Sequence, residues 1–234
     1  MQKQFAFIQQ EISDVPSQKN WLSARERETL NRFKIAKRRH DWLLGRWTAK
    51  QAVLHFLALN LAHQKMETVE IIAADDGAPE VFLAGKPMDC TLSISHSHAR
   101  GLCAITAGKT PLGCDIEKID KRSEAFVRDY FTESELELVR RTEMTEQAFL
   151  TNLIWCAKES ALKALREGLR IDTRQLQFSC SPDRLRPERG TFKVVFKPEQ
   201  RHFYGCWLQE NNFVITFAAE KTWGEWQLIR LELS

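Results

Sequence analysis

The stretch WTAKQAVLHFL at residues 47–57 returns as WCAKESALKAL at residues 155–165, with the Trp, the first Ala, the Lys and both Leu positions identical at a constant offset of 108 (155 − 47). A later pair of similar runs is LCAITA at 102–107 and FVITFA at 213–218. Such internal similarity indicates a duplicated unit, although two amphipathic helices can also resemble each other by chance. We predict an α+β fold, a pseudo-dimer of two similar α+β halves, each with a long helix packed on a small antiparallel sheet.

Hydrophobic periodicity around these two stretches predicts the other elements. Apolar residues recur at helical spacing over 33–63 and 146–169, and a further helical region covers 124–141. Short apolar runs between turn-forming residues predict strands at 69–73, 81–83, 91–95, 102–106, 112–117, 191–197, 204–209, 213–218 and 226–233. The two halves are predicted to be residues 1–110 and 111–234.

Composition excludes several classes of protein. The 234 residues are 43% hydrophobic and 28% charged, which is typical of a globular chain with a real core and excludes disordered and collagen-like chains. The net charge of +3 is too small to indicate nucleic-acid binding by itself. The six cysteines form no CxxC pair, which favours reduced thiols over a zinc site. Because no apolar segment resembles a signal peptide or a membrane span, we expect a cytoplasmic protein.

A pair of carboxylates follows from the strand predicted within PLGCDIE, residues 111–117. Side chains alternate along a strand, so every second residue from Leu112 points to one face while Gly113, Asp115 and Glu117 share the other. Two carboxylates this close repel each other unless a cation or a proton lies between them. The pattern is consistent with a divalent cation bound by oxygen ligands. Solvated acids at a strand edge are the alternative.

The second long helix carries a further acid. Trp155, Glu159 and Lys163 are four residues apart and form one stripe beside the apolar face, with Lys158 next to them. An ordinary helical Glu–Lys pair would have the same spacing. If Glu159 meets the strand pair, three carboxylates complete a magnesium site, and the lysines can hold phosphate oxygens.

Two other patterns suggest phosphate binding. His96 ends a predicted strand in the run LSISHSH, residues 92–98, where it can donate to a phosphate or simply be solvated. A basic cluster enters the first long helix, in which Arg38 and Arg46 lie two turns apart on one face. Its members are Lys34, Lys37, Arg38, Arg39, Arg46 and Lys50. A solvated basic face is the alternative.

Taken together and in this order, the motifs SHS (95–97), GCDIE (113–117), FTESE (131–135) and WCAKESALK (155–163) resemble those of the 4′-phosphopantetheinyl transferases, of the larger type that activates surfactin and enterobactin synthetases. LLGR at 43–46 is also similar to the family. The resemblance spans about residues 43–163. It implies a pseudo-dimer of two α+β halves with coenzyme A bound between them.

The resemblance also implies a reaction. A serine hydroxyl of an acyl or peptidyl carrier protein attacks the β-phosphate of coenzyme A, the phosphopantetheine arm is transferred, and 3′,5′-ADP leaves. Asp115, Glu117 and Glu159 match the family's Mg²⁺ ligands, and Glu159 also matches the residue that deprotonates the serine, directly or through water. Lys158 and Lys163 match lysines that hold the pyrophosphate and assist the leaving group.

Three residues of the N-terminal half match positions that bind the phosphates of coenzyme A, namely Arg38, Arg46 and His96. The family's Gly-Lys-Pro run has two candidates here, GAP at 77–79 and GKP at 85–87, and the choice between them stays open. Basic residues after the carboxylate strand are candidates for the carrier-protein surface: Lys121, Arg122 and Arg128.

The resemblance leaves the pathway open among fatty-acid, polyketide, nonribosomal-peptide and siderophore synthesis. We expect a monomer whose partners are coenzyme A and a carrier protein, and neither nucleic acid nor a membrane. The alternatives are a magnesium-dependent phosphohydrolase that uses the same carboxylates with water as nucleophile, and a non-catalytic module that binds carrier proteins.

Overall fold

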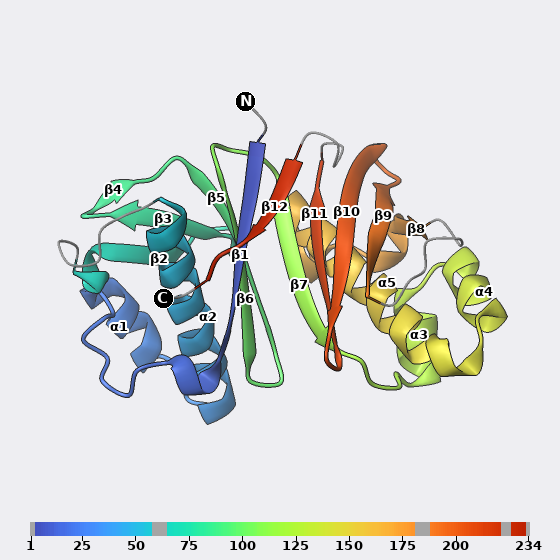
Figure 1. The fold of residues 1–234 in the computed structure, drawn as a ribbon, viewed down its shortest axis with the longest axis horizontal. Helices are drawn as coiled ribbons and strands as arrows, with labels where there is room; N and C mark the ends of the chain where they lie inside the picture. Colours follow the sequence, from blue (N-terminus) through green and yellow to red (C-terminus); the bar gives the residue numbers. More distant parts are fainter. Residues whose placement is uncertain (1–2, 58–64, 181–187, 221–225, 233–234) are drawn as a thin grey trace. The chain divides into compact units, whose positions relative to one another are not determined.

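The computed structural model of the chain describes residues 3–57, 65–180, 188–220 and 226–232 (Figure 1). They form two compact units: unit 1 contains Met1–Thr110 and Trp226–Ser234, and unit 2 contains Pro111–Glu225. The C-terminal segment thus belongs to unit 1 and not to the unit that precedes it in the chain. Strand β12 (Trp226–Arg230) pairs in parallel with β1 (Lys3–Glu11), so its backbone hydrogen bonds join it to unit 1.

Unit 1 consists of the long helix α2 (Ala36–Phe56), the short helix α1 (Ala24–Asn31) and two sheets. The larger sheet has the strand order β12-β1-β6-β5 and is antiparallel except for the β12–β1 pair. The smaller sheet is β2-β3-β4. The strands not yet delimited are β2 (Val69–Ala73), β3 (Pro79–Leu83), β4 (Lys86–Pro87), β5 (Cys90–Ser97) and β6 (Arg100–Ala107).

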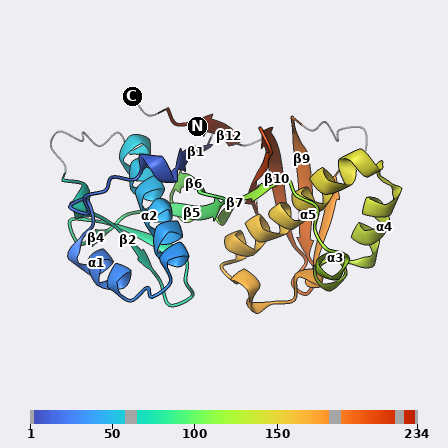
Figure 2. The same ribbon diagram turned by 90° about the horizontal axis from the view of Figure 1, so that it is seen from below.

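Unit 2 has one antiparallel sheet of order β7-β11-β10-β9-β8, with the long helix α5 (Met144–Leu165) packed on it (Figure 2). Two short helices, α3 (Glu124–Tyr130) and α4 (Glu133–Arg141), connect β7 to α5. The strands are β7 (Leu112–Lys118), β8 (Leu176–Cys180), β9 (Arg189–Phe196), β10 (Arg201–Glu210) and β11 (Phe213–Ala219). A long helix on a sheet is therefore present in each unit, antiparallel in unit 2 and mixed in unit 1 because β12 and β1 are parallel, which confirms the α+β class.

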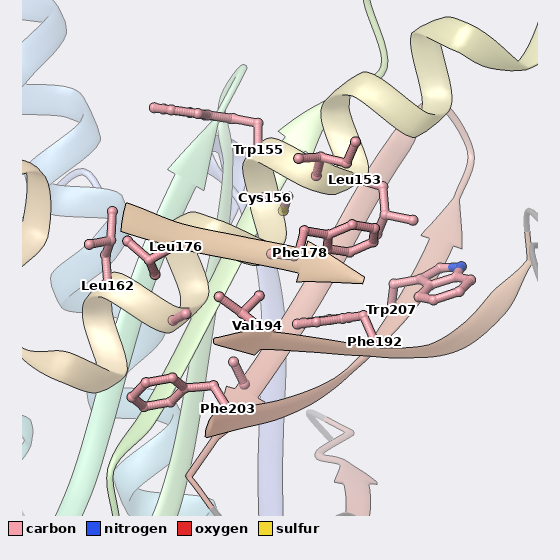
Figure 3. Packing of buried hydrophobic residues seen from close by; sticks show 14 of the residues in the cluster. Leu153, Trp155, Cys156, Leu162, Leu176, Phe178, Phe192, Val194, Phe203 and Trp207 are labelled. Carbon is pink, nitrogen blue, oxygen red and sulfur yellow. The ribbon is translucent and has the colours of Figure 1, made fainter. Parts of the chain in front are cut away.

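The core of unit 2 lies between α5 and its sheet (Figure 3). Leu153, Cys156 and Leu162 of α5 meet Val194, Phe203 and other apolar residues of the strands, all of them buried. The equivalent core of unit 1 forms where α2 packs on β1, β5 and β6. Burial of these helix faces is the main source of stability for helices of this length. None of the described helices combines the length and the apolarity needed to cross a bilayer.

Several element boundaries differ from the sequence pattern. The helical region predicted at 124–141 is two helices, because Phe131 is extended and Thr132 begins α4 with a capping box shared with Glu135. Helix α5 ends at Leu165, since Arg166 adopts a left-handed conformation with φ 62°. The periodicity missed β1, β8 and α1. Residues 58–63 of the first predicted helix and residue 233 of the last predicted strand lie outside the described residues.

Candidate active site

The face of β7 that carries Gly113, Asp115 and Glu117 lies against α5. At Gly113 the helix is so close that an ideal Cβ would lie 1.8 Å from the Ser160 carbonyl oxygen, and only glycine fits there. On the neighbouring strand β11, Thr216 is paired with Asp115 and donates to the Cys156 carbonyl oxygen at 2.9 Å. The alternation predicted for the strand is confirmed, and its polar face points to the helix that carries the third acid.

Asp115 is held by a lysine of α5. Its Oδ1 accepts a hydrogen bond from Lys163 Nζ at 2.8 Å, and the same Nζ donates to the Cys114 carbonyl oxygen at 3.0 Å. The Asp115 side chain is 6% exposed and that of Lys163 is 26% exposed. Burial alone would lower the pKa of Lys163, but the charges of Asp115 and Glu159 outweigh it and raise that pKa. Lys163 is thus a fixed cation at the site.

Glu117 is held by two donors. Arg122 Nη2 lies 3.0 Å from Glu117 Oε2, and Trp155 Nε1 donates to Glu117 Oε1 at 3.1 Å. Arg122 is itself oriented by Asn152, whose Oδ1 accepts from Nε at 2.8 Å. Burial and the charge of Asp115 raise the pKa of Glu117, while Arg122 and Trp155 oppose that rise.

The sequence suggested that Arg122 lies on a carrier-protein surface, but in the structure its guanidinium group forms an ion pair with Glu117. In the sequence, only the position of Arg122 five residues after Glu117 could have indicated this contact. The other two candidates for that surface, Lys121 and Arg128, are exposed.

Glu159 is the least satisfied of the three acids. Its Oε1 is buried, and no donor in the described part of the chain reaches it. Burial comes first among the causes that raise the pKa of Glu159 to about 7, followed by the charge of Asp115, with Glu117 adding to the rise and Lys163 opposing it. Glu159 lies four residues from Trp155 and four from Lys163, the two α5 residues that donate to Glu117 and Asp115, so this stretch of α5 lies against the strand pair.

The donor chemistry fits a hard divalent cation. The charge of Asp115 raises the pKa values of Glu117 and Glu159, and the buried Oε1 of Glu159 has no hydrogen-bond donor in the described residues. A cation with oxygen ligands would stabilise such a group of carboxylates. Within the described ranges, no group of three or more His, Cys, Asp or Glu side chains is already arranged as a metal-ion cluster. Asp115 and Glu117 instead turn oxygens to Lys163, Arg122 and Trp155.

Lys158 does not join this group. Its Nζ lies 2.6 Å from Glu135 Oε2 and donates to the Tyr130 carbonyl oxygen at 3.1 Å. The side chain is 0% exposed, and burial lowers the pKa of Lys158 while the charge of Glu135 opposes that shift. A phosphate cannot reach this ammonium group without displacing a buried carboxylate, so the phosphate-binding role expected for Lys158 does not fit its placement.

The three residues predicted to bind phosphates in the N-terminal half all belong to unit 1. Arg38 is exposed on α2, and His96 is exposed near the end of β5. Arg46 is half-buried further along α2, with its guanidinium group 5.0 Å from the centre of the Trp42 ring and a buried Nε that has no acceptor in the described residues. Burial lowers the pKa of Arg46, with Glu26 opposing the shift. Their role in binding phosphates stays a prediction.

Comparison with known proteins identifies the family. The sequence profile of the 4′-phosphopantetheinyl transferase superfamily matches twice, at residues 4–107 and 111–218, in agreement with the predicted duplication. The 4′-phosphopantetheinyl transferase Sfp of Bacillus subtilis (strain 168) is 26% identical over 157 residues, which cover 65% of this chain and 63% of Sfp. The 4′-phosphopantetheinyl transferase gsp of Aneurinibacillus migulanus is 32% identical over 90 residues, 37% of each chain.

The alignments thus cover less than two thirds of the length of either relative. Among solved structures, the holo-(acyl-carrier-protein) synthase of Thermotoga maritima aligns with a TM-score of 0.37 and 18% identity, over 53% of this chain and 71% of that chain. Because the family profile matches nearly the whole chain in two successive halves, the chain belongs to the 4′-phosphopantetheinyl transferase superfamily.

Proposed function

We propose that this protein transfers the 4′-phosphopantetheine arm of coenzyme A to a serine of a carrier protein and releases 3′,5′-ADP. The observation that carries the proposal is the pair of contacts between α5 and β7, Lys163 with Asp115 and Trp155 with Glu117, on either side of Glu159 along the helix, within a chain of this family. Phosphoryl transfer requires positioned charges more than covalent chemistry from the protein, and this group supplies both signs of charge.

Asp115, Glu117 and Glu159 are the residues that would hold Mg²⁺. The fit rests on their carboxylate oxygens and on the unsatisfied Oε1 of Glu159. Bound there, the ion would offset the negative charge that develops on the phosphates of coenzyme A during transfer.

The residues of the chain have separate tasks in this proposal. Glu159, with a pKa of about 7, is poised to accept the proton of the serine hydroxyl as that oxygen attacks the β-phosphate, directly or through water. Lys163 keeps its charge, and Asp115 orients it toward the pyrophosphate, in which the bond between the β-phosphorus and the bridging oxygen breaks and that oxygen leaves with 3′,5′-ADP. Arg38, Arg46 and His96 are proposed to bind the phosphates of coenzyme A.

The proposal includes a carrier protein as partner and the cytoplasm as location. All six cysteines are free in the structure, as expected where thiols stay reduced.

A mass-shift assay tests the reaction. Purified protein is incubated with coenzyme A, Mg²⁺ and apo carrier proteins of the fatty-acid, polyketide, peptide and siderophore types. We expect at least one carrier to gain the mass of one phosphopantetheine, with 3′,5′-ADP appearing in equal amount. Release of 3′,5′-ADP together with free phosphopantetheine, the carrier staying unmodified, would instead establish a phosphohydrolase. Carrier binding without either product would establish a non-catalytic module.

The carboxylate group also predicts a link between pH, Mg²⁺ and stability. The pKa of Glu159 rises from 4.5 to about 7 on folding, so the folded state binds more protons than the unfolded state between these values. The metal-free protein therefore loses stability as the pH rises through this window. We expect Mg²⁺ at about 100 times its dissociation constant to add about 2.7 kcal/mol at pH 8, or roughly 5–10 °C in Tm, and far less at pH 5.

Glu159→Gln is the control for this prediction. In calorimetric scans without Mg²⁺, the variant should gain stability relative to the unmodified protein as the pH rises from 5 to 8, because its amide does not ionise. It should also lose most of the Mg²⁺-induced rise in Tm. An equal Mg²⁺ effect on both proteins would exclude Glu159 as a ligand.

A further inference from the structure

A buried ion pair ties three elements of unit 2 together. Lys158 of α5 meets Glu135 of α4, with Nζ and Oε2 2.6 Å apart and both side chains at most 1% exposed. Glu135 Oε2 also accepts from the backbone N–H of Thr132 at 2.8 Å, and its Oε1 accepts from the backbone N–H of Phe178 in β8 at 2.7 Å. One carboxylate thus links α5, the beginning of α4 and an edge strand.

Unit 1 contains the same arrangement at equivalent positions. Lys50 of α2 meets Glu26 of α1, with Nζ and Oε2 2.6 Å apart and both side chains 0% exposed. Glu26 Oε2 accepts from the backbone N–H of Ser23 at 2.9 Å, and its Oε1 accepts from the backbone N–H of Ile71 in β2 at 3.0 Å. Lys50 donates to the Trp21 carbonyl oxygen at 2.7 Å, as Lys158 does to that of Tyr130.

The Lys50–Glu26 pair in unit 1 shows whether such a buried pair needs a carboxylate site beside it. Lys50 is followed by Gln51, whereas Lys158 is followed by Glu159, and β1, which pairs with β6 as β7 pairs with β11, carries no pair of acids comparable to Asp115 and Glu117. The buried Lys–Glu pair is therefore formed with or without a neighbouring carboxylate site. Its occurrence in both units is explained by packing alone.

The geometry of α5 relates the Lys158–Glu135 pair to the carboxylate site on β7. Lys158 lies about 100° around α5 from Glu159 and about 140° from Lys163, so it points into the core while they point to β7. We propose that Lys158 is a positioning residue: through Glu135 it fixes the rotation of α5, and thereby directs Glu159 and Lys163 at β7, without contacting phosphate. This rests on the proposed transfer activity and replaces the phosphate-binding role that the resemblance assigned to Lys158.

The test compares Lys158→Met with its matched control, Lys50→Met. Lys50 belongs to the basic cluster in the sequence, but its side chain is 0% exposed and paired with Glu26, so it is not available to a phosphate. Both variants leave a buried carboxylate without its cation, and both should lower Tm by about 6–20 °C. Measured well below Tm, the dissociation constant for coenzyme A by calorimetry should stay within about twofold of that of the unmodified protein in both. Only Lys158→Met should lower kcat, by about 10²-fold, because only α5 carries Glu159 and Lys163.

A second variant covers the case in which Lys158→Met does not fold. Glu135→Gln keeps the lysine but removes the charge that holds it, and should lower kcat with coenzyme A affinity unchanged. Because the partners act as one unit, the double variant Glu135→Gln/Lys158→Met should be much less destabilised than the sum of the two single variants.

The outcomes separate the two proposals. A tenfold weaker binding of coenzyme A in Lys158→Met, with wild-type affinity in Lys50→Met, would show that Lys158 contacts the ligand and would overturn the positioning role. An unchanged kcat in Lys158→Met or Glu135→Gln would overturn it as well. Failure of the unmodified protein to bind coenzyme A would instead refute the proposed function, and additive effects in the double variant would refute the coupling between Lys158 and Glu135.

Discussion

Replacing Asp115 by asparagine is expected to lower kcat for phosphopantetheine transfer by about 10³-fold or more while the protein stays folded. The substitution keeps the shape of the side chain and an oxygen that can accept from Lys163, but it removes the negative charge at the centre of the site. That charge holds Lys163 and is one of three that would bind the divalent cation.

The control for this prediction is Asp120→Asn, two residues beyond the end of the same strand. The Asp120 side chain is about half exposed and pairs with Lys118 at 3.0 Å, and its hydrogen bond from Asn152 of α5 is to the backbone carbonyl oxygen, which the substitution keeps, so kcat should stay within about twofold. Kinetics should be measured at saturating carrier protein with coenzyme A varied, and circular dichroism should show that both variants fold. Activity of Asp115→Asn within tenfold of the unmodified protein would remove Asp115 from the proposed site.

Replacing Gly113 by alanine is expected to destabilise unit 2 by about 3 kcal/mol or more, or at least roughly 6–12 °C in Tm. The new Cβ would lie 1.8 Å from the Ser160 carbonyl oxygen and 2.8 Å from the Ser160 carbonyl carbon, and helix backbone cannot rotate away as a side chain could. Helix α5 would have to move off β7 by more than an ångström, which would also separate Lys163 from Asp115 and lower activity.

Gly45→Ala is the matched control, since Gly45 lies within α2 and the added Cβ would meet only the end of the Ile94 side chain, at 3.1 Å. Alanine favours the helix by about 1 kcal/mol, which offsets a small repacking cost, so its Tm should change little. Urea unfolding of both variants checks the prediction. A Gly113→Ala protein as stable as Gly45→Ala would mean that the close contact between β7 and α5 is absent in solution.

Local patterns in the sequence predicted much of the fold. The alternation along β7 placed Gly113, Asp115 and Glu117 on one face, and the four-residue stripe on α5 placed Trp155 and Glu159 together. Both follow from the geometry of a single strand or helix, which neighbouring elements do not change. The repeated stretch likewise predicted that each half has one long helix on a sheet, and the repeated match of the family profile agrees.

Elements without such a pattern were missed, for physical reasons that are visible in the structure. Strand β8 contains only five residues, and pairing with β9 decides its conformation. The break between α3 and α4 depends on the capping box of Thr132, a signal of two residues that the apolar spacing on either side obscured.

The sequence by itself determined which chemical groups lie on which face of each helix and strand, because those faces follow from the periodicity of the local backbone. Only the tertiary structure decided which partner each group meets. Lys163 and Asp115 are 48 residues apart and Lys158 and Glu135 are 23 apart (158 − 135), so their contacts depend on how α5 packs on the sheet and on α4. Two lysines of one helix, five residues apart, therefore have different environments: packing buries Lys158 in the core, and it leaves Lys163 at the carboxylate site.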